Sequence, residues 1–419
     1  MTTVLVTVFA TLVVVVIASN LTSSEQRIQY RVEHLYGVED EQFERTVGNL
    51  LPPGFIGGNT IECLDNGACY FPAMLEAIRS ARETINLETF IFWSGDIGSQ
   101  FADALIERAR AGVEVRVLID WIGSFKASRA LIRRMRRAGV EVVKFRPPRL
   151  TGITNFNNRT HRKILVIDGR LGFTGGAGIA DSWKGRARDT RHWRDSQYRI
   201  RGPLVWQLQS AFMDNWLQTR AQVLHGERFF PPLEPVGSTR AQVFISGPQE
   251  GLESARLLYL ISIACARRRI LLGHAYFVPD NLCVEALIDA RRRGVEVELT
   301  IAGPTDAHIV RRAAINRIGR LLEAGVKVYV FQKAMYHRKL MIVDDCWVSV
   351  GSANFDNRSF RINDEICLNV LDSAFACSMA EGYERDKGQC VELTLEEWRN
   401  RPPWQKAVDW SCALLRSQL

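Results

Sequence analysis

Several motifs that identify common enzyme classes are absent from this sequence. It contains no Walker loop, no Gly-x-Ser-x-Gly elbow, no His-Glu-x-x-His pair and no Gly-x-Gly-x-x-Gly loop. These absences argue against a P-loop nucleotidase, an α/β-hydrolase, a zincin protease and a dinucleotide-binding enzyme.

Cysteine is used in a way that excludes two structural roles. The nine cysteines are odd in number and scattered, and none belongs to a Cys-x-x-Cys pair. This pattern favours reduced thiols in a core over a disulfide framework or a zinc site. Reduced thiols predict a domain that faces the cytosol.

Extremes of composition are missing as well. Hydrophobic residues make up 47% and charged residues 24% of the 419 residues, which excludes disordered, collagen-like and polytopic membrane proteins. The length favours two or three domains. The 54 basic and 46 acidic side chains leave a formal charge of +8. The surface should therefore attract anions such as phosphodiesters, acidic lipid headgroups or nucleic acid.

The N-terminal segment lacks charge. No charged side chain precedes Glu25, and residues 4–18 are almost wholly apolar, so this segment prefers hydrocarbon to water. A cleaved signal peptide would carry basic residues before the apolar run, whereas Arg27 and Arg31 follow it. We therefore predict an uncleaved transmembrane anchor over residues 1–24. The positive-inside rule then places the catalytic part on the cytoplasmic side of the cell membrane.

The rest of the chain consists of two related halves. Residues 104–119 and 286–301 each contain a helix that ends at glycine and leads into a Val/Ile-rich strand, which is half of a βαβ unit. A second helix, glycine and strand follow in each copy, and this repetition in the same order indicates duplication. Prolines in residues 229–238 mark the connection. The predicted α/β organisation has five parts: the anchor at 1–24, a connecting segment at 25–59, a first half at 60–234, a second half at 235–394 and an amphipathic tail at 395–419.

Each half contains one copy of the polar motif His-x-Lys-x4-Asp. The spacing is the same in both copies, which are formed by His161, Lys163 and Asp168 and by His337, Lys339 and Asp344. Side chains alternate along a strand, so the histidine and lysine of each copy share a face. Each aspartate lies at the following turn and at an odd offset from that face. We therefore predict that the aspartates fasten a hairpin and do not contact a substrate.

Two histidines and two lysines that converge on one point suit phosphodiester exchange. A neutral imidazole can attack phosphorus and form a phosphohistidine, and a protonated imidazole can give its proton to the leaving alcohol. The two ammonium groups would neutralise the nonbridging oxygens as charge develops, so this chemistry requires no metal ion or other cofactor. Either water or an alcohol could open the phosphohistidine, which leaves both hydrolysis and transfer open.

The paired motifs resemble the signature of the phospholipase D superfamily, which is His-x-Lys-x4-Asp-x6-Gly-Gly/Ser-x-Asn in two copies. The second copy fits fully, and its continuation over residues 354–359, Asn-Phe-Asp-Asn-Arg-Ser, is similar to bacterial cardiolipin synthases. Tyr-Phe-Val-Pro-Asp at residues 276–280 is similar to them as well. The first copy departs from the signature because Gly178 stands where the family carries asparagine.

The resemblance implies a duplicated phospholipase D fold of two α/β sandwich halves, related by a pseudo-twofold axis, with one shared active site. It implies that His161 is the nucleophile and His337 the general acid. It also implies a set of phosphate-binding residues, namely Lys163, Lys339, Gly176, Ser352 and Asn354. Asp195 and Glu365 occupy the family's downstream acidic positions, where a carboxylate orients a histidine. Which acid serves which histidine stays open.

The activity implied by the resemblance is that of a membrane-associated phosphatidyltransferase of cardiolipin synthase type, acting as a monomer on phospholipids. It would transfer a phosphatidyl group to phosphatidylglycerol, with phosphatidylglycerol or phosphatidylethanolamine as donor, and no nucleic acid is expected as a partner. A phospholipase D or nuclease that uses water is one alternative, and an inactive lipid-binding protein, prompted by Gly178, is another. The tail contains Trp398, Trp404 and Trp410, and it either packs on the core or lies in the membrane interface.

Overall fold

The computed structural model describes residues 28–148, 157–248 and 253–413, together with Thr7 and Thr11. The predicted anchor lies outside these residues apart from the two threonines. Within the described part of the chain, no helix is both long enough and apolar enough to cross a membrane. All nine cysteines are described, and each is a free thiol.

The two halves of the chain repeat the same strand order in one sheet of 15 strands. From the centre outwards, the first half supplies β1 (Ile56–Asp65), β8 (Ser196–Arg201), β6 (Leu171–Gly175), β5 (Ile164–Ile167), β2 (Thr84–Thr89), β3 (Glu114–Asp120) and β4 (Glu141–Phe145). The second half supplies β9 (Thr239–Ser246), β18 (Glu365–Leu371), β16 (Trp347–Gly351), β15 (Lys339–Val343), β10 (Arg269–His274), β12 (Glu296–Ala302), β13 (Lys327–Phe331) and, at the edge, β19 (Cys390–Glu392). Antiparallel pairing of β1 with β9 joins the halves.

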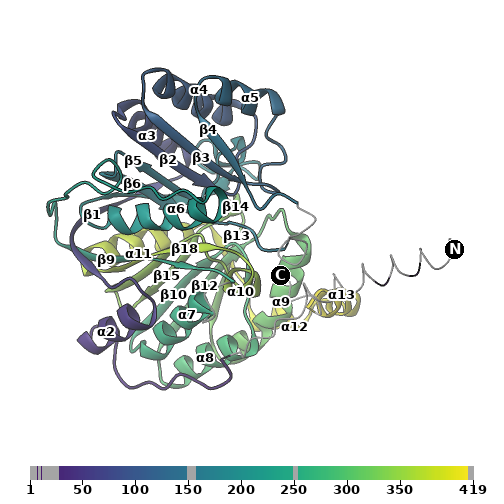
Figure 1. Ribbon diagram of the computed structural model, residues 1–419. Coiled ribbons are helices and arrows are strands. Elements are labelled where there is room, and N and C mark those ends of the chain that lie inside the picture. Colours follow the sequence, from purple (N-terminus) through teal and green to yellow (C-terminus); the bar gives the residue numbers. More distant parts are fainter. Residues whose placement is uncertain (1–6, 8–10, 12–27, 149–156, 249–252, 414–419) are drawn as a thin grey trace.

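Helices cover the sheet in three layers, as Figure 1 shows. One outer layer consists of α3 (Gly67–Ser80), α4 (Asp96–Arg110) and α5 (Arg129–Arg137), and the other of α7 (Ser254–Cys265), α8 (Asn281–Arg292) and α9 (His308–Glu323). The middle layer is formed by α6 (Val205–Arg220) and α11 (Ser373–Lys387). Trp216 of α6 and Tyr383 of α11 belong to one apolar core that also contains strand residues of both halves. The halves are therefore joined by a shared core as well as by the sheet.

The repeated helix, glycine and strand pattern has a local physical cause. Gly112 and Gly294 follow the helices α4 and α8 with φ angles of 90° and 91°, a left-handed conformation that glycine adopts without steric cost. The parallel strands β3 and β12 come next, and all their residues except the first are buried. Burial of successive residues, whose side chains point to opposite faces, shows that both strands are covered on both faces.

Each polar motif leads into a hairpin, β5–β6 in the first half and β15–β16 in the second. The φ angle is positive at both central residues of each turn, with values of 52° and 62° from Asp168 and of 52° and 57° from Asp344, as in a type I′ turn. The Asp168 carboxylate accepts three hydrogen bonds of 2.8–2.9 Å from the backbone N–H groups of residues 82–84. The Asp344 carboxylate accepts three of 2.7–2.9 Å from residues 267–269. Both carboxylates fasten a turn to the start of a parallel strand.

Short pairings outside the large sheet connect each half to the histidine segment of the other. In the first half, β7 (Trp193–Arg194) runs parallel to β14 (Met335–Tyr336) of the second half. Thr160 forms the corresponding parallel bridge with Asp364. Within the second half, β11 (Phe277–Val278) pairs with β17 (Phe355–Asp356), which leads into α10 (Asn357–Arg361).

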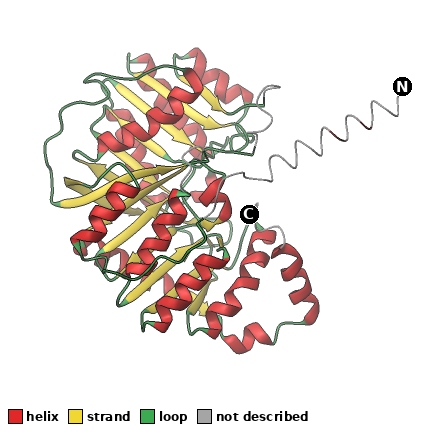
Figure 2. Ribbon diagram, turned by 60° about the horizontal axis from the view of Figure 1, so that its bottom comes forward, coloured by secondary structure: helices red, strands yellow, loops and turns green. Residues whose placement is uncertain are grey.

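The terminal helices lie on the second half. Helix α2 (Glu41–Leu50) packs against α7, whereas α12 (Leu395–Arg399) and α13 (Pro403–Ala413) pack against α9. Figure 1 labels α9, α12 and α13 together at one side of the molecule, and Figure 2 shows them projecting from the layered body. The indole N–H of Trp398 donates to the carbonyl of Ile315 in α9 at 2.8 Å. The described part of the tail therefore packs on a helix of the fold, and residues 414–419 lie outside the described chain.

Candidate active site

The two His-x-Lys segments enter the same region from opposite halves, and the arginine inside each segment fixes its rotation. Arg162 bonds to Asp214 of α6 at 2.7 Å, and Arg338 bonds to Asp386 of α11 at 2.9 Å. Alternation along an extended chain then turns the histidine and the lysine of each segment away from these helices. The middle helix layer thus orients the reactive face of each segment.

The backbone of each histidine is bound to the other half. The N–H of His161 donates to the carbonyl of Asp364 at 2.8 Å, and the N–H of His337 donates to the carbonyl of Arg194 at 2.8 Å. Each accepting residue directly precedes one of the two predicted histidine-orienting acids. The short pairings between halves therefore place an acid beside each histidine.

The histidine side chains are also bound to the opposite half. Nδ1 of His161 lies 2.9 Å and 3.1 Å from the two carboxylate oxygens of Glu365, and Nδ1 of His337 lies 2.7 Å from Oδ2 of Asp195. When Nδ1–H donates to the carboxylate, the Nε2 lone pair remains for chemistry. Each acid therefore contacts the histidine of the opposite half, a pairing that the sequence leaves open.

Both lysines lie beside the histidines. Nζ of Lys163 donates to the carbonyl of His161 at 2.6 Å, and Nζ of Lys339 donates to the carbonyl of His337 at 2.7 Å. Nζ of Lys339 also lies 3.2 Å from Nε2 of His337. The charge of each lysine lowers the pKa of the histidine in the other half. The four side chains therefore share one electrostatic environment.

Burial dominates the protonation of this cluster. It lowers the pKa of each histidine to about 4, and the nearby ammonium groups act in the same direction. Burial also lowers the pKa of Lys163 to about 7 and that of Lys339 to about 8. Burial opposes ionisation of Asp195 and Glu365, but the adjacent histidines and lysines hold both pKa values below their usual range. Both imidazoles are therefore neutral near pH 7 in the unliganded protein, and an entering phosphodiester anion would favour protonation of one of them.

The loops after the two hairpins contact these acids. The hydroxyl of Ser352 donates to the carboxylate of Glu365. Gly176 occupies the same place in the first half, and a Cβ there would lie 2.4 Å from Oδ1 of Asp195. The indole N–H of Trp183 instead donates to Oδ2 of Asp195 at 3.0 Å. The loops thus position the acids, and phosphate binding by Gly176 and Ser352 stays a prediction.

The departure from the signature at Gly178 has a steric explanation. A Cβ at this position would lie 2.8 Å from Cβ of Ile91 and 3.2 Å from the ring of Trp183. Trp183 ends the short 3₁₀ helix η2 (Asp181–Trp183) and is almost fully buried. Its indole fills the space that an asparagine side chain would need. In the second half, Oδ1 of Asn354 is buried without a hydrogen-bond partner among the described residues, so it is available to a ligand.

Aromatic rings surround the histidines, and the sequence analysis did not identify them. The rings of Trp183 and Trp193 lie with their centroids 5.4 Å and 5.0 Å from that of His337. The ring centroid of Phe90 lies 5.3 Å from that of His161. The only sequence signal for Trp183 is its position shortly after the missing asparagine, and nothing local in the sequence points to the other two rings.

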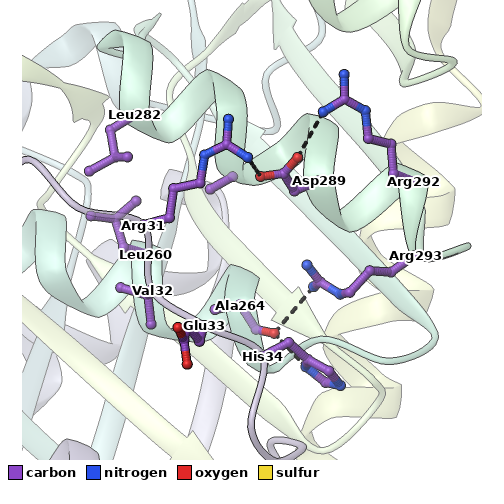
Figure 3. Close-up of a pocket in the computed structure, with 11 residues that line it drawn as sticks. Arg31, Val32, Glu33, His34, Leu260, Ala264, Leu282, Asp289, Arg292 and Arg293 are labelled. Atoms are coloured by element: carbon purple, nitrogen blue, oxygen red, sulfur yellow. Dashed lines mark hydrogen bonds and ion pairs between the residues drawn. The ribbon is translucent and has the colours of Figure 1, made fainter.

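A separate cavity of about 410 Å³ lies between the N-terminal segment and the helices α7 and α8 (Figure 3). Its arginines are engaged: Arg31 and Arg292 bond to Asp289 at 2.7 Å and 3.0 Å, and Arg293 donates to the carbonyl of Ala264 at 3.2 Å. The cavity marks the junction where the N-terminal segment docks on the second half.

Comparison with known proteins agrees with this geometry. The family model described as "Cardiolipin synthase, PLD-like domain" matches residues 74–189 and 259–387, which include both polar motifs. The chain is 33% identical over 353 residues to the major cardiolipin synthase of Bacillus subtilis, an alignment that covers 84% of this chain and 73% of that protein. It is 36% identical over 342 residues to a cardiolipin synthase of Geobacillus kaustophilus, covering 81% of this chain and 68% of that protein.

A solved structure shows the same fold at low sequence identity. The crystal structure of phosphatidylserine synthase from Haemophilus influenzae superposes with a TM-score of 0.70 at 15% identity, covering 91% of this chain and 100% of that chain. The fold, the two polar motifs and the relatives agree, and the chain belongs to the cardiolipin synthase family of phospholipase D-like proteins.

Proposed function

We propose that this protein is a phosphatidyltransferase that makes cardiolipin through a phosphohistidine. One observation carries the proposal: two histidines from opposite halves, each bound through Nδ1 to a carboxylate of the other half, lie with two lysines in one buried cluster. The family relationship supports phospholipids as substrates.

In the first step, Nε2 of His161 attacks the phosphorus of a phosphatidyl donor. The bond between phosphorus and the headgroup oxygen breaks, and that oxygen takes the proton from Nε2 of His337. Lys163 and Lys339 neutralise the nonbridging oxygens while charge accumulates. With phosphatidylglycerol as donor, the products are glycerol and a phosphatidyl group on His161.

In the second step, a hydroxyl group of phosphatidylglycerol attacks the phosphohistidine. Its proton passes to Nε2 of His337, the phosphorus–nitrogen bond breaks, and cardiolipin forms. The cycle ends with His161 unmodified and His337 again protonated. Two molecules of phosphatidylglycerol thus give one cardiolipin and one glycerol, and phosphatidylethanolamine in place of the donor would release ethanolamine.

Exposure supports the order of the two histidines, which family resemblance suggests. The side chain of His161 is 12% exposed, and that of His337 is 6% exposed between two indole rings. The more accessible imidazole suits the nucleophile. The predicted anchor at 1–24 places the enzyme at the cell membrane with its catalytic part in the cytoplasm, where one chain forms one complete site.

Mass spectrometry of the lipids formed from phosphatidylglycerol by the purified full-length protein tests this function. Cardiolipin and glycerol are expected, and His161→Ala and His337→Ala should each lower the rate by on the order of 10³-fold. With a donor radiolabelled at phosphorus, the label should be trapped on the wild-type protein through a phosphorus–nitrogen bond, which is labile in acid and stable in base. Phosphatidic acid as the sole product would identify a hydrolase that uses water. No lipid turnover, with or without phosphatidylethanolamine, would refute the proposal.

A further inference from the structure

Helix α13 presents apolar side chains to solvent and buries its acid. Trp404 and Trp410 are 61% and 60% exposed, and Val408 is exposed between them in sequence. Asp409 is buried on the opposite side, where it bonds to Arg401 at 2.6 Å and to Arg312 of α9 at 3.2 Å. A helix that only packs on a soluble domain has the reverse arrangement, with apolar groups inside.

Further exposed apolar side chains lie in both halves, in segments that follow the parallel strands β3 and β12. Ile309, in the first turn of α9, is exposed beside α13. In the first half, Ile122 and Phe125 are exposed in the loop after β3, where Phe125 is 69% accessible. Nζ of Lys126 lies 4.0 Å from the centroid of Trp93 and 5.6 Å from that of Phe125. We call these side chains the apolar rim: Ile122, Phe125, Ile309, Trp404, Val408 and Trp410.

The segments that carry the apolar rim and the segments that carry the histidines lie at the same ends of the strands, the carboxyl ends of the parallel strands. Lys339 is opposite the last residue of β10, so the reactive segment lies at the carboxyl ends of the parallel strands. The loops that follow β3 and β12 leave from these same ends. The hydroxyl of Tyr276 donates at 2.5 Å to Asp306, two residues before α9, and its ring centroid lies 6.2 Å from that of His337. Tyr276 therefore links the segment that leads into α9 to the site.

We propose that the apolar rim seats on the surface of an anionic phospholipid bilayer, so that substrate lipids pass from the bilayer to the histidines without crossing water. The inference rests on the proposed function and names the surface through which that function reaches its substrate. It adds a contact that is independent of the predicted N-terminal anchor.

The chemistry of the rim favours a bilayer over a protein partner. Tryptophan prefers the boundary between acyl chains and headgroups, where its ring is apolar and its N–H is hydrated. The charged residues beside the rim are mainly basic, with Lys126 in the first half and Arg311 and Lys406 in the second, while the acid of α13 is buried in ion pairs. This charge complements acidic lipid headgroups.

The N-terminal segment also joins the fold near the carboxyl ends of the parallel strands. The carbonyl of Ile28 accepts a hydrogen bond of 3.1 Å from Arg256, which forms an ion pair with Asp280 at 2.6 Å. Asp280 follows β11, whose Val278 packs with Ala313 and Ala314 of α9 and with Cys412 of α13. The predicted membrane segment and the rim therefore meet the fold on one side.

Quenching by brominated lipids tests the contact without turnover. The full-length protein is bound to vesicles of equal parts phosphatidylglycerol and phosphatidylcholine with bromine on the acyl chains. Tryptophan emission should be quenched, and the quenched fraction should fall by about half in Trp404→Ala/Trp410→Ala. The control is Leu50→Ala/Val236→Ala, which removes two exposed apolar side chains near the opposite ends of the strands. It should be quenched like the wild type.

Activity provides the second measurement. The Trp404→Ala/Trp410→Ala protein should make cardiolipin about tenfold more slowly from vesicles, yet within about twofold of the wild type from monomeric dihexanoyl phosphatidylglycerol, which shows that the site is folded. Equal loss on both substrates, or unchanged quenching, would overturn the proposal. A dimer in detergent that the double variant converts to a monomer, without quenching, would identify a second copy as the occupant and also overturn it. A wild type that is quenched but makes no cardiolipin would refute only the proposed reaction.

Discussion

At the scale of single residues, the site depends on hydrogen bonds between the halves. Each histidine receives its carboxylate from the other half, and an uncharged amide cannot stabilise the imidazolium that forms during the reaction. Asp195→Asn and Glu365→Gln should therefore each lower kcat by on the order of 10³-fold. The Glu365→Gln protein should form the phosphohistidine slowly, because that acid serves the proposed nucleophile. Single-turnover trapping measures this step.

The control for the acids is Glu62→Gln, which alters a half-exposed carboxylate paired with Arg199 on the surface of β1. Its rate should stay within about twofold of the wild type. If Glu365→Gln formed the adduct at the normal rate and Asp195→Asn did not, the roles of the two histidines would have to be exchanged.

Trp183 carries a second prediction at this scale. Its indole N–H donates to Asp195, so Trp183→Phe keeps an aromatic ring against His337 and removes one hydrogen bond to the orienting acid. One such bond to a charged group corresponds to about a tenfold fall in kcat. Trp206→Phe removes an indole bond of 2.8 Å to the Pro231 carbonyl outside the site and serves as the control. Equal kcat values for the two variants would show that Trp183 only fills space.

The pH dependence follows from the lowered pKa values. The value of kcat/KM reports the unliganded enzyme. It should fall below pH 4 to 5, because protonation of His161, with a pKa of about 4, removes the nucleophile. It should also decline gradually above this range, because His337, with a pKa of about 4, must hold a proton to act as the general acid. A steeper alkaline limb should follow as the pH rises through 7 to 8, because Lys163 and Lys339, with pKa values of about 7 and 8, then lose the charge that attracts the phosphodiester. Lys163→Arg should move the alkaline limb upward, since guanidinium keeps its proton.

Steady-state rates between pH 4 and 9 measure both limbs. The sequence analysis assigns a charged imidazole to the general acid, and burial instead leaves both imidazoles neutral before substrate binds. If the alkaline limb occurred at the same pH in Lys163→Arg and in Lys339→Arg as in the wild type, deprotonation of His337 would be its cause.

At the scale of elements, the hairpin turns carry a prediction about stability. The buried carboxylate of Asp344 accepts hydrogen bonds from three backbone N–H groups, two at Oδ1 and one at Oδ2. An amide keeps one accepting oxygen and would place an NH2 group against the N–H groups that bond to the other oxygen. Asp344→Asn should therefore lower the free energy of unfolding by about 2 kcal/mol. Asp345→Asn, next in the same turn, alters a partly exposed ion pair with Arg269 and should cost less than about 1 kcal/mol. Thermal unfolding of both variants compares the two, and equal losses would contradict the fastening role.

Elements were predictable from the sequence where short-range patterns determine them. The helix, glycine and strand repeats and the two hairpin turns depend on residues a few positions apart. The acid pairing was not predictable, because the bonded residues are separated by 204 and 142 positions. The indole of Trp183 was missed for a related reason, since its effect on Gly178 arises only from packing. The predicted anchor lies in residues that the structure does not describe.

At the scale of the whole molecule, the two halves depend on each other. Asp386 of α11 accepts a bond of 2.8 Å from Arg194 of the first half and one of 2.9 Å from Arg338 of the second. All three side chains are buried, so separating the halves would leave unpaired charges at a cost of several kcal/mol. The carbonyl of Arg194 also binds the backbone of His337. The contacts that hold the halves together therefore also position the reactive groups.

This dependence predicts the result of combining two inactive chains. If both histidines, both lysines and both acids of a site come from one chain, then His161→Ala and His337→Ala proteins made together in the same cells cannot complement each other. The mixture should form cardiolipin no faster than the sum of the separate variants. The control is wild type made together with His161→Ala. Its activity should be proportional to the amount of wild-type protein in the mixture. Recovery of about a quarter of the wild-type rate would mean that the connection between the halves lets two chains exchange halves, as in domain swapping, and that a complete site can be assembled from two copies.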